Sequence, residues 1–357
     1  MQIKRKQTPD FSIILLKWNK EKNRRQMPWK GEKDPYKIWL SEIILQQTRV
    51  EQGLKYYKNF IKAFPDIHKL AKAKDQKIYK LWEGLGYYTR CRNLIQTAHF
   101  VSKDLNGKFP GQYEEIKKLK GVGPYTAAAI ASFAFNEPRA VVDGNVFRVL
   151  SRIFGIDKPI DSTDGKKYFN QLANELLDKQ QPGLYNQAIM DFGAVICKPE
   201  PLCEQCPFNK YCKVFLSDRV FSFPVKIKKT IIQKRWIYYI LIEHKEKFAI
   251  WQRTEKDIWH NLFEFFLIES IGGLDEKGVL KEIKKKGWLS KNGVEIMSVS
   301  PVFRQQLSHR LIEGRFTRLK VQFKPDLPDG VLWVRKAEIK NYAFPKFINQ
   351  YLQKKDV

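Results

Sequence analysis

The spacing of apolar residues divides the chain into a helical part and a strand-rich part. Over residues 8–212, apolar side chains recur every three or four positions, which is the spacing of amphipathic helices. Short groups of Gly, Pro and Asn separate these segments. The pattern predicts helices over residues 35–45, 56–64, 145–154, 163–177 and 185–196. It also predicts a helix that Asp75 caps and a helix whose first turn contains Pro124.

The pattern changes after Cys212. Residues 213–232 are rich in Lys and contain Pro224, a composition typical of a linker. Aromatic and β-branched residues then fill 236–242 and 248–251 on either side of a polar turn, which predicts a β-hairpin. Further strands are predicted over 263–269, 293–300 and 316–323, and further helices over 276–286 and 345–353.

The length of 357 residues fits two domains of ordinary size. We expect an all-α domain over residues 1–212, a linker over 213–232 and a smaller α+β domain over 233–357. Hydrophobic residues make up 43% of the chain and charged residues 29%, which excludes a largely disordered or collagen-like chain. No apolar run approaches the roughly 18 residues of a membrane span. The run over 13–16 is too short for a signal peptide.

The charge is strongly positive. The chain carries 65 Lys and Arg against 38 Asp and Glu, a formal net charge of +27 that both halves share. Such a surface favours a polyanionic partner, nucleic acid ahead of an anionic membrane. A Lys-rich genome or a need for solubility would give the same sum. The net charge therefore indicates a class of partner, whereas the activity has to be inferred from the motifs.

Four of the five cysteines lie close together, at Cys197, Cys203, Cys206 and Cys212. A secreted disulfide framework would spread its cysteines in pairs, so this grouping indicates a metal site in a reducing, cytoplasmic compartment. Thiolates suit either a [4Fe–4S] cluster or tetrahedral zinc, and the spacing does not decide between them. The site has no open position, so its expected role is structural. Cys91 stands alone and is expected to be an ordinary buried thiol.

Two glycines flank Val122 between two predicted helices, in the order Gly121-Val122-Gly123. This order suits a tight helix–hairpin–helix turn whose backbone N–H groups face a phosphate at a helix N-terminus. Such a turn binds the DNA backbone without reading the bases. The same pattern also occurs in turns that bind no ligand, so it gains weight only beside other motifs.

Two carboxylates stand in settings that suit acid–base chemistry. Glu42 lies among apolar residues, and Asp143 precedes an apolar helix. By itself Glu42 would ordinarily be a solvated helix residue, and Asp143 an N-cap. If Glu42 is desolvated, its pKa rises and it becomes a proton donor near neutral pH. The pair could then divide the roles of acid and electrostatic stabiliser, as carboxylate pairs do in glycoside hydrolysis.

The motifs occur in an order that is similar to one family. They are Pro28-Trp29, WLSEIILQQT at 39–48, Gly84-Leu85-Gly86-Tyr87-Tyr88, GVGPYTAAAI at 121–130, VVDGNVFRVLSR at 141–152 and the four-cysteine loop. Together they resemble the adenine DNA glycosylases of the MutY type, in the helix–hairpin–helix superfamily that includes endonuclease III. The resemblance covers residues 8–212. Residues 233–357 resemble the family's Nudix-like C-terminal domain, with Gln306-Leu307-Ser308-His309 at a loop that usually reads Phe-Ser-His.

The resemblance implies a base-excision-repair enzyme that removes adenine mispaired with 8-oxoguanine or guanine in duplex DNA and leaves an abasic site. Glu42 would protonate the leaving adenine and Asp143 would stabilise the oxocarbenium-like sugar, with support from Tyr125 and Asn145. The cysteine loop would hold a [4Fe–4S] cluster. We expect a monofunctional, monomeric enzyme without a membrane partner, associated with the nucleoid if the source is bacterial.

The resemblance also implies contacts with DNA. The residues implied to line the base pocket are Trp29 and Lys30. Those implied to fill the gap left by the flipped adenine and to contact the opposite base are Gln47, Tyr87 and Tyr88. Those implied to form the loop that reads 8-oxoguanine are Leu307, Ser308 and His309. Those that complete the DNA-binding set are Thr48, Gly121, Val122 and Gly123.

Three positions depart from the family pattern. The first cysteine gap is one residue shorter than the family's, Leu307 replaces Phe, and Lys30 stands where Arg is common. None of these departures touches the two carboxylates. The C-terminal part also lacks the clustered glutamates of a Nudix signature, so we expect no pyrophosphatase activity there.

Two other classes of protein compete with this interpretation. A bifunctional glycosylase with lyase activity would carry a Schiff-base Lys where this chain has Tyr125, and a phenol cannot form an imine. A non-enzymatic iron–sulfur protein that binds DNA or carries electrons would not need Glu42 and Asp143 as a buried pair. An excision assay on an A:8-oxoguanine duplex, with and without alkali, separates the three classes.

Overall fold

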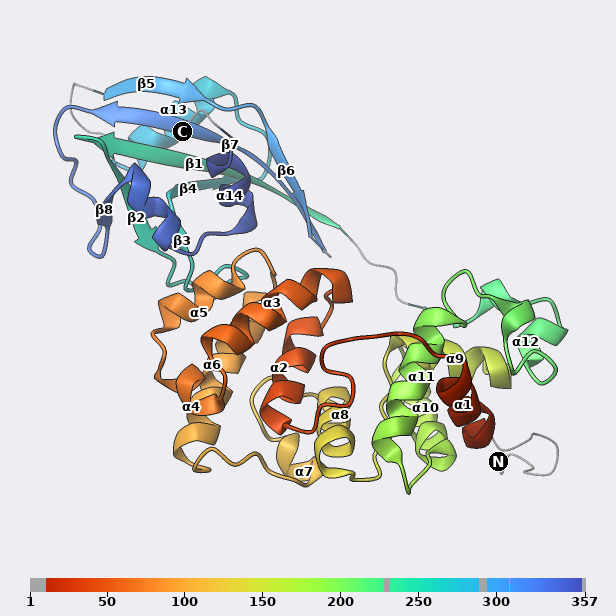
Figure 1. The fold of residues 1–357 in the computed structure, drawn as a ribbon. Helices are drawn as coiled ribbons and strands as arrows, with labels where there is room; N and C mark the ends of the chain where they lie inside the picture. Colours follow the sequence, from red (N-terminus) through yellow and green to blue (C-terminus); the bar gives the residue numbers. More distant parts are fainter. Residues whose placement is uncertain (1–10, 228–231, 289–293, 308, 355–357) are drawn as a thin grey trace. The chain divides into compact units, whose positions relative to one another are not determined.

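The computed structural model describes residues 11–227, 232–288, 294–307 and 309–354. Contacts divide the described chain into two compact units, and each is described by itself. One unit combines Met1–Lys72 with Asn93–Lys228, and the other combines Ala73–Arg92 with Lys229–Val357. The first is helical and the second is built on a β-sheet (Figure 1). Among the described residues, no helix is long and apolar enough to cross a membrane.

The helical unit contains short and medium-length helices joined by tight loops. Its elements are α1 (Phe11–Glu21), α2 (Pro35–Leu45), α3 (Val50–Ala63), α4 (Ile67–Lys72), most of α6 (Tyr88–Lys103), α7 (Tyr113–Ile116), α8 (Pro124–Phe135), α9 (Gly144–Phe154), α10 (Thr163–Leu176), α11 (Pro182–Val195), η1 (Cys203–Gln205), α12 (Lys213–Leu216) and η2 (Val220–Ser222).

Two helices of this unit, α2 and α8, are buried on almost every side and pack against each other. In α2 every residue from 38 to 44 is buried, and in α8 every residue from 126 to 132 is buried. α2 begins where the Asp34 side chain accepts a hydrogen bond from the Tyr36 N–H at 2.9 Å. A helix surrounded by protein keeps water from its polar side chains, so this packing desolvates Glu42.

The helices α9 and α11 lie against each other in a second apolar core, which also takes in α1. Asp143 caps the N-terminus of α9, as the sequence predicts for this position. α9 ends at Gly155, whose φ of 61° is the left-handed conformation that glycine adopts without strain. The two ends of α9 are therefore fixed, and with them the direction of the Asp143 carboxylate.

The sheet unit combines a mixed sheet with helices. Its elements are α5 (Asp75–Trp82), β1 (Gln233–His244), β2 (Lys247–Gln252), β3 (Phe263–Glu264), β4 (Phe266–Ser270), α13 (Glu276–Lys285), β5 (Val294–Val299), β6 (Phe303–Gln306), β7 (Arg310–Val321), β8 (Leu332–Arg335), η3 (Lys336–Asn341) and α14 (Lys346–Leu352). The strands run in the order β3-β2-β1-β7-β5, with β4 beside β1, β6 beside β7 and β8 beside β2.

The long strand β1 is parallel to β7 and antiparallel to β2 and β4. Alternate residues of β1 face opposite sides of the sheet. Tyr238 and its neighbours on one face pack with Val279 and Ile283 of α13. Tyr239 on the other face lies near Phe347 of α14. The sheet is therefore covered by a helix on each face (Figure 1).

Helix α5 belongs to the sheet unit although about 150 residues separate it from β1 in the sequence. The Asn261 side chain donates to the Tyr79 hydroxyl at 3.1 Å. Lys80 donates to the carbonyl of Tyr342 at 2.9 Å, and Glu83 accepts from the N–H of Phe344 at 2.8 Å. These bonds attach α5 to the loops that follow β2 and β8.

Most predicted elements are confirmed, including the β1–β2 hairpin, α13 and α14. Two interpretations are corrected. Asp75 is the first helical residue of α5 and Lys74 holds the N-cap position, because Asp75 has already adopted the helical conformation. The predicted linker begins within the helical unit, where α12 and η2 lie. The short strands β6 and β8 were not predicted.

Candidate active site

One pocket in the helical unit gathers residues from distant parts of the sequence. Its walls come from the loop before α2, the C-terminal half of α2, the starts of α8 and α9, and one side of α11. The predicted site residues that line it are Trp29, Lys30, Glu42, Gln47, Thr48, Tyr125, Asp143 and Asn145. The fold therefore brings the two carboxylates and the base-pocket residues to one place.

Glu42 is a buried carboxyl group, with 8% of its surface exposed. Burial is the largest cause that raises its pKa, to about 7. A hydrogen bond with Tyr125 opposes this shift, and the nearby charge of Asp143 adds to it. A carboxyl group whose pKa lies near neutrality can keep its proton at neutral pH, which suits a proton donor.

Asp143 is held by the N-terminus of α9. Its carboxylate accepts from the N–H of Val146 at 2.7 Å and from the Asn145 amide at 2.9 Å. Burial raises the pKa of Asp143, while these hydrogen bonds and the charge of Arg148 lower it. The positive end of the helix dipole also favours an anion at this position. The result is a carboxylate with a fixed direction beside the pocket.

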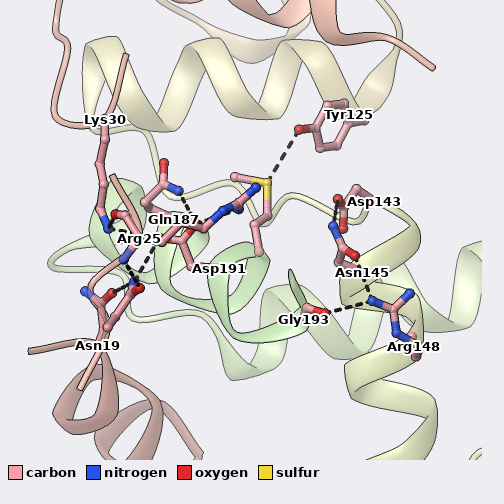
Figure 2. A network of polar contacts seen from close by, with 12 residues as sticks. Asn19, Arg25, Lys30, Tyr125, Asp143, Asn145, Arg148, Gln187, Asp191 and Gly193 are labelled. Atoms are coloured by element: carbon pink, nitrogen blue, oxygen red, sulfur yellow. Dashed lines mark hydrogen bonds and ion pairs between the residues drawn. The ribbon is translucent and has the colours of Figure 1, made fainter. Parts of the chain in front are cut away.

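Arg148 extends this arrangement to Gly193 of α11 (Figure 2) and also to the cysteine loop. It donates to the Asn145 side-chain oxygen at 2.8 Å and to the carbonyl of Gly193 at 2.8 Å. Its Nε donates to the carbonyl of Cys197 at 2.7 Å. Because the Asn145 oxygen faces Arg148, its nitrogen faces Asp143. The sequence did not predict this role, since Arg148 appears only as one charged residue in an amphipathic helix.

Tyr125 stands at the start of α8 and contacts both sides of the pocket. Its hydroxyl hydrogen-bonds with Glu42 and lies 3.5 Å from Sδ of Met190 on α11. Burial raises the pKa of Tyr125 well above its usual value, and the two carboxylates add to the effect. The side chain therefore remains a neutral phenol that positions Glu42.

Lys30 lines the pocket and is engaged by an acid. Its ammonium group lies 2.9 Å from the carboxylate of Asp191, a fully buried residue of α11. Arg25 lies at the same distance from the other oxygen of that carboxylate (Figure 2). Trp29 packs edge-on against Tyr57, with ring centroids 5.3 Å apart. The base-pocket residues are thus held by contacts to α3 and α11.

The four grouped cysteines line one small cavity of the helical unit. All four are free thiols, and apolar residues such as Phe192 and Leu202 surround them. Burial raises the pKa of each thiol. In the described parts of the chain, no group of three or more His, Cys, Asp or Glu could hold a single metal ion. Cys91 does not line this cavity and is fully buried, as predicted.

Comparisons with known proteins support the same interpretation. The family model described as "HhH-GPD superfamily base excision DNA repair protein" matches residues 40–179, and one described as "NUDIX domain" matches residues 237–354. The chain is 36% identical over 307 residues to the adenine DNA glycosylase of Buchnera aphidicola subsp. Baizongia pistaciae, covering 84% of this chain and 83% of that protein. The chain belongs to the adenine DNA glycosylase family. It is thus a DNA glycosylase, an enzyme that hydrolyses N-glycosyl bonds.

Other relatives agree with this assignment. The human adenine DNA glycosylase is 40% identical to this glycosylase over 213 residues, covering 57% of this chain and 39% of that protein. A thermostable thymine-DNA glycosylase structure is 32% identical with a TM-score of 0.54, covering 58% of this chain and 95% of that one. A non-covalent endonuclease III–DNA complex is 20% identical with a TM-score of 0.50, covering 58% and 94%, and shows a shared fold.

The hairpin of this glycosylase depends on its first glycine. Gly121 has a φ of 79°, and a Cβ there would lie 2.7 Å from Cβ of Asn93. Val122 is buried, while Gly123 provides the N-cap position of α8 without a side chain. The exposed backbone at the start of α8 leaves room for a phosphate.

The residues predicted to enter the duplex differ in exposure. Gln47 is exposed and Tyr87 is 44% exposed, and both have positive φ values, 55° and 50°. Such strained non-glycine conformations are concentrated at functional sites. Tyr88 is buried, and its hydroxyl accepts from the N–H of Gly84 at 3.3 Å. The two tyrosines therefore have different surroundings, and Tyr87 is the exposed one.

Tyr87 is supported by a buried guanidinium group in the sheet unit. Arg90 lies 5.3 Å from the ring centroid of Tyr87 and 5.3 Å from that of Trp82. Arg90 is almost fully buried, and its own surroundings lower its pKa to about 10, mainly through burial. It stays charged at neutral pH and can hold the Tyr87 ring from below by a cation–π contact.

The predicted 8-oxoguanine loop joins β6 to β7. The N–H of Leu307 donates to the carbonyl of Arg310 at 2.7 Å, which closes the turn. His309 is exposed, and its carbonyl accepts from the N–H of Gln233 at 2.9 Å. Ser308 lies outside the described residues. The antiparallel pairing of β6 with β7 supports the turn on both sides.

Sequence reasoning missed several residues of the pocket. They are Arg25, Gln187 and Met190, together with Asp191 and Arg148 beside it. Gln187 and Asp191 are four positions apart on a predicted helix, and that spacing places them on one face. This spacing was the available signal, but an acid and an amide on an amphipathic helix usually face solvent.

Proposed function

We propose that this glycosylase removes adenine paired with 8-oxoguanine or guanine in duplex DNA and leaves an abasic site. The observation that carries the proposal is the pocket that both carboxyl groups line, in which burial and the nearby charge of Asp143 raise the pKa of Glu42. The names of the curated relatives indicate that adenine is the base removed. The two carboxyl groups account for the proposed reaction.

The proposed reaction begins with extrusion of the adenine from the helix. Neither carboxyl group can reach a glycosidic bond inside a stacked duplex, so the nucleotide must rotate into the pocket. The gap left behind would be filled by Gln47 and Tyr87, whose exposed and strained conformations suit insertion. Stacking by an aromatic ring offsets part of the few kcal/mol that base flipping costs.

Glu42 then acts as the general acid. Proton transfer from its carboxyl group to N7 lets adenine leave as a neutral base, and the Tyr125 hydroxyl holds that carboxyl group in place. Asp143 stabilises the positive charge that develops on the sugar as the bond between C1′ and N9 breaks, and a water molecule then adds to C1′ and loses a proton, which leaves the abasic site. A carboxylate about 4 Å away at an effective dielectric constant near 20 contributes roughly 4 kcal/mol. This corresponds to about a thousandfold in rate.

The opposite base would be read by the sheet unit. The β6–β7 turn with Leu307 and His309 is supported by two paired strands, so its exposed groups keep a defined position. The Nudix-like match covers this turn, which supports the assignment. Ser308 completes the proposed recognition loop.

The four thiols fit a [4Fe–4S] cluster. Cys197, Cys203, Cys206 and Cys212 line one cavity with apolar walls, and four thiolates are the usual ligands of such a cluster. When bound, the cluster would hold the loop after α11 in a fixed conformation. Arg148 contacts both the loop and the Asn145 side chain, so a fixed loop would also fix the position of Asn145.

Single-turnover excision on matched duplexes tests the proposal. The purified holoenzyme is incubated with A:8-oxoguanine, A:G, A:T and T:G duplexes, and the products are separated before and after alkali. We expect release of adenine from the first two duplexes, with strand scission only after alkali. Strand scission without alkali, together with borohydride trapping, would instead identify a lyase. Excision of thymine alone would identify a different base specificity.

A further inference from the structure

Tyr87, the exposed residue proposed to fill the gap in the duplex, lies in the turn that joins α5 to α6. Its φ of 50° is a conformation that a residue other than glycine keeps only when its surroundings hold it there. The indole N–H of Trp82, a buried residue at the end of α5, donates to the carbonyl of Gly86 at 3.0 Å. The N–H of Leu85 donates to the carbonyl of Trp82, also at 3.0 Å. The position of Tyr87 therefore depends on α5.

Helix α5 is in turn held by the loop after β2, over residues 253–262. Tyr79 of α5 is buried, and its hydroxyl accepts a hydrogen bond from the Asn261 side chain at 3.1 Å. Arg92, near the start of α6, donates to the carbonyl of His260 at 3.4 Å. Two neighbouring loop residues thus contact the chain before and after the α5–α6 turn. The position of that turn therefore depends on this loop.

The loop itself is fixed by a buried group of charges that the proposed reaction does not use. Arg253 is 4% exposed and donates to Glu264 at 2.7 Å and to both oxygens of Asp257, at 2.7 and 3.1 Å. The N–H of Asn261 donates to the carbonyl of Arg253 at 2.9 Å. Because a buried guanidinium group has lost its water, it needs such partners, and their geometry restricts its orientation. The two ends of the loop are thereby bound to each other and to the sheet.

The sheet unit therefore contains two groups that the proposed function brings to the DNA. Tyr87 belongs to this unit through α5, and the β6–β7 turn belongs to it directly. We propose that Asn261 is a positioning residue for Tyr87: through the Tyr79 hydroxyl it fixes α5, and α5 fixes the turn from which the ring enters the duplex. The sheet unit then contributes to extrusion of adenine as well as to the choice of the opposite base. This inference rests on the proposed function.

The backbone at Asn261 allows its side chain to be removed without strain. Its φ is 70°, which glycine adopts freely, so Asn261→Gly deletes the donor and imposes no backbone penalty. Asn261→Asp keeps a hydrogen bond in the reverse direction, because the Tyr79 hydroxyl can donate to a carboxylate. Tyr79→Phe removes the partner instead. We expect Asn261→Gly and Tyr79→Phe each to lower the rate of adenine excision roughly fivefold, the factor that corresponds to one ordinary hydrogen bond. Asn261→Asp should stay within about twofold of the wild type.

The test is a double-variant cycle between Asn261 and Tyr87, which lie on separate elements. Single-turnover excision is measured on A:8-oxoguanine and A:G duplexes. The proteins are the wild type, Tyr87→Ala, Asn261→Gly, Asn261→Asp, Tyr79→Phe and the double variants Asn261→Gly/Tyr87→Ala and Tyr79→Phe/Tyr87→Ala. Asn106→Gly is the matched control, because Asn106 is exposed and also has a positive φ, 50°. Thermal melting of each protein reports on folding.

A positioning role predicts that the losses do not add. Tyr87→Ala should lower the rate by at least about fivefold on both duplexes, because the stacking of one aromatic ring is lost. Asn261→Gly should lower the rate further by less than about twofold in that background, since the support matters only while the ring is present. A purely structural role would instead multiply the two losses. If Asn261→Gly does not fold, the same comparison is made with Tyr79→Phe.

The remaining outcomes separate this inference from the proposed function. Wild-type rates in Asn261→Gly, multiplied losses in the double variant or a loss confined to A:8-oxoguanine would each contradict the inference and leave the glycosylase proposal standing. A Tyr87→Ala variant with the wild-type rate would overturn the inference together with the gap-filling role of Tyr87. A wild type that releases no adenine would overturn the proposed function, and the inference with it.

Discussion

The pocket of the helical unit and the β6–β7 turn of the sheet unit use their polar groups in opposite ways. In the pocket, Glu42 is buried and burial raises its pKa to about 7, which is the property that the proposed acid needs. At the turn, His309 is exposed, and its proposed role requires only that the side chain be held at a fixed position in solvent. If the proposed roles hold, the comparison teaches that catalysis depends on removing water, whereas recognition depends on a rigid support in water.

The comparison also extends to how each region is assembled. The pocket collects side chains from α2, α8, α9 and α11, which are far apart in the sequence. The turn is a short continuous segment between two paired strands. A change in a pocket residue should therefore affect the reaction broadly, while a change in the turn should affect the choice of substrate.

The largest expected effect comes from Glu42→Gln. Gln keeps the shape of the side chain and has no acidic proton to give, so adenine release should fall by at least about a hundredfold. Duplex binding should remain largely intact, because the pocket retains its other walls. Single-turnover excision and a filter-binding assay measure the two properties. Glu51→Gln, an exposed position on α3, serves as the control. A residual rate above about a tenth of the wild type would exclude Glu42 as the acid.

The pH dependence should show the consequence of burial directly. The active form of Glu42 is protonated, and its pKa is about 7 because burial raises it. The single-turnover rate should therefore be nearly constant below about pH 6, fall to about half near pH 7, and then fall further, approaching about tenfold for each pH unit. A rate that is flat from pH 6 to pH 9 would contradict this assignment. A profile that falls only below pH 5 would point to Asp143 alone.

Replacing Leu307 and His309 by Ala should produce a smaller and more selective effect. The double variant should lose a few-fold to about tenfold of its rate on A:8-oxoguanine, since one or two exposed contacts are removed. Its rate on A:G should change much less. Ile271→Ala, at a fully exposed residue of the same unit, is the control. Equal losses on both duplexes would show that the turn does not distinguish the opposite base.

The smallest expected effect is at Cys91. Cys91→Ser should leave the iron content of anaerobically purified protein unchanged, because Cys91 is buried and does not line the cavity of the other four cysteines. Cys203→Ser, by contrast, should lower the iron content and the visible absorbance, since Cys203 lines the cysteine cavity. Protein that contains zinc and no iron would overturn the [4Fe–4S] proposal.

The sequence predicted those features that follow from local patterns. The helices around Glu42 and Asp143 and the β1–β2 hairpin were accessible because periodicity reports which face of an element is buried. The burial of Glu42 itself could only be stated as a condition, since it depends on α8 covering α2. Asp191 escaped prediction because the four side chains that donate hydrogen bonds to it come from a loop and from its own helix, and no local pattern records that meeting.

The attachment of α5 to the sheet unit has a consequence for how the chain is made. Tyr79, Lys80 and Glu83 leave the ribosome long before Asn261, Tyr342 and Phe344 have been synthesised. Residues 73–92 therefore emerge within the helical part of the chain before the residues that they contact in the sheet unit have been made. For the same reason, a chimera that exchanges only the C-terminal part between relatives would separate these partners. A transferable module would have to include residues 73–92 as well.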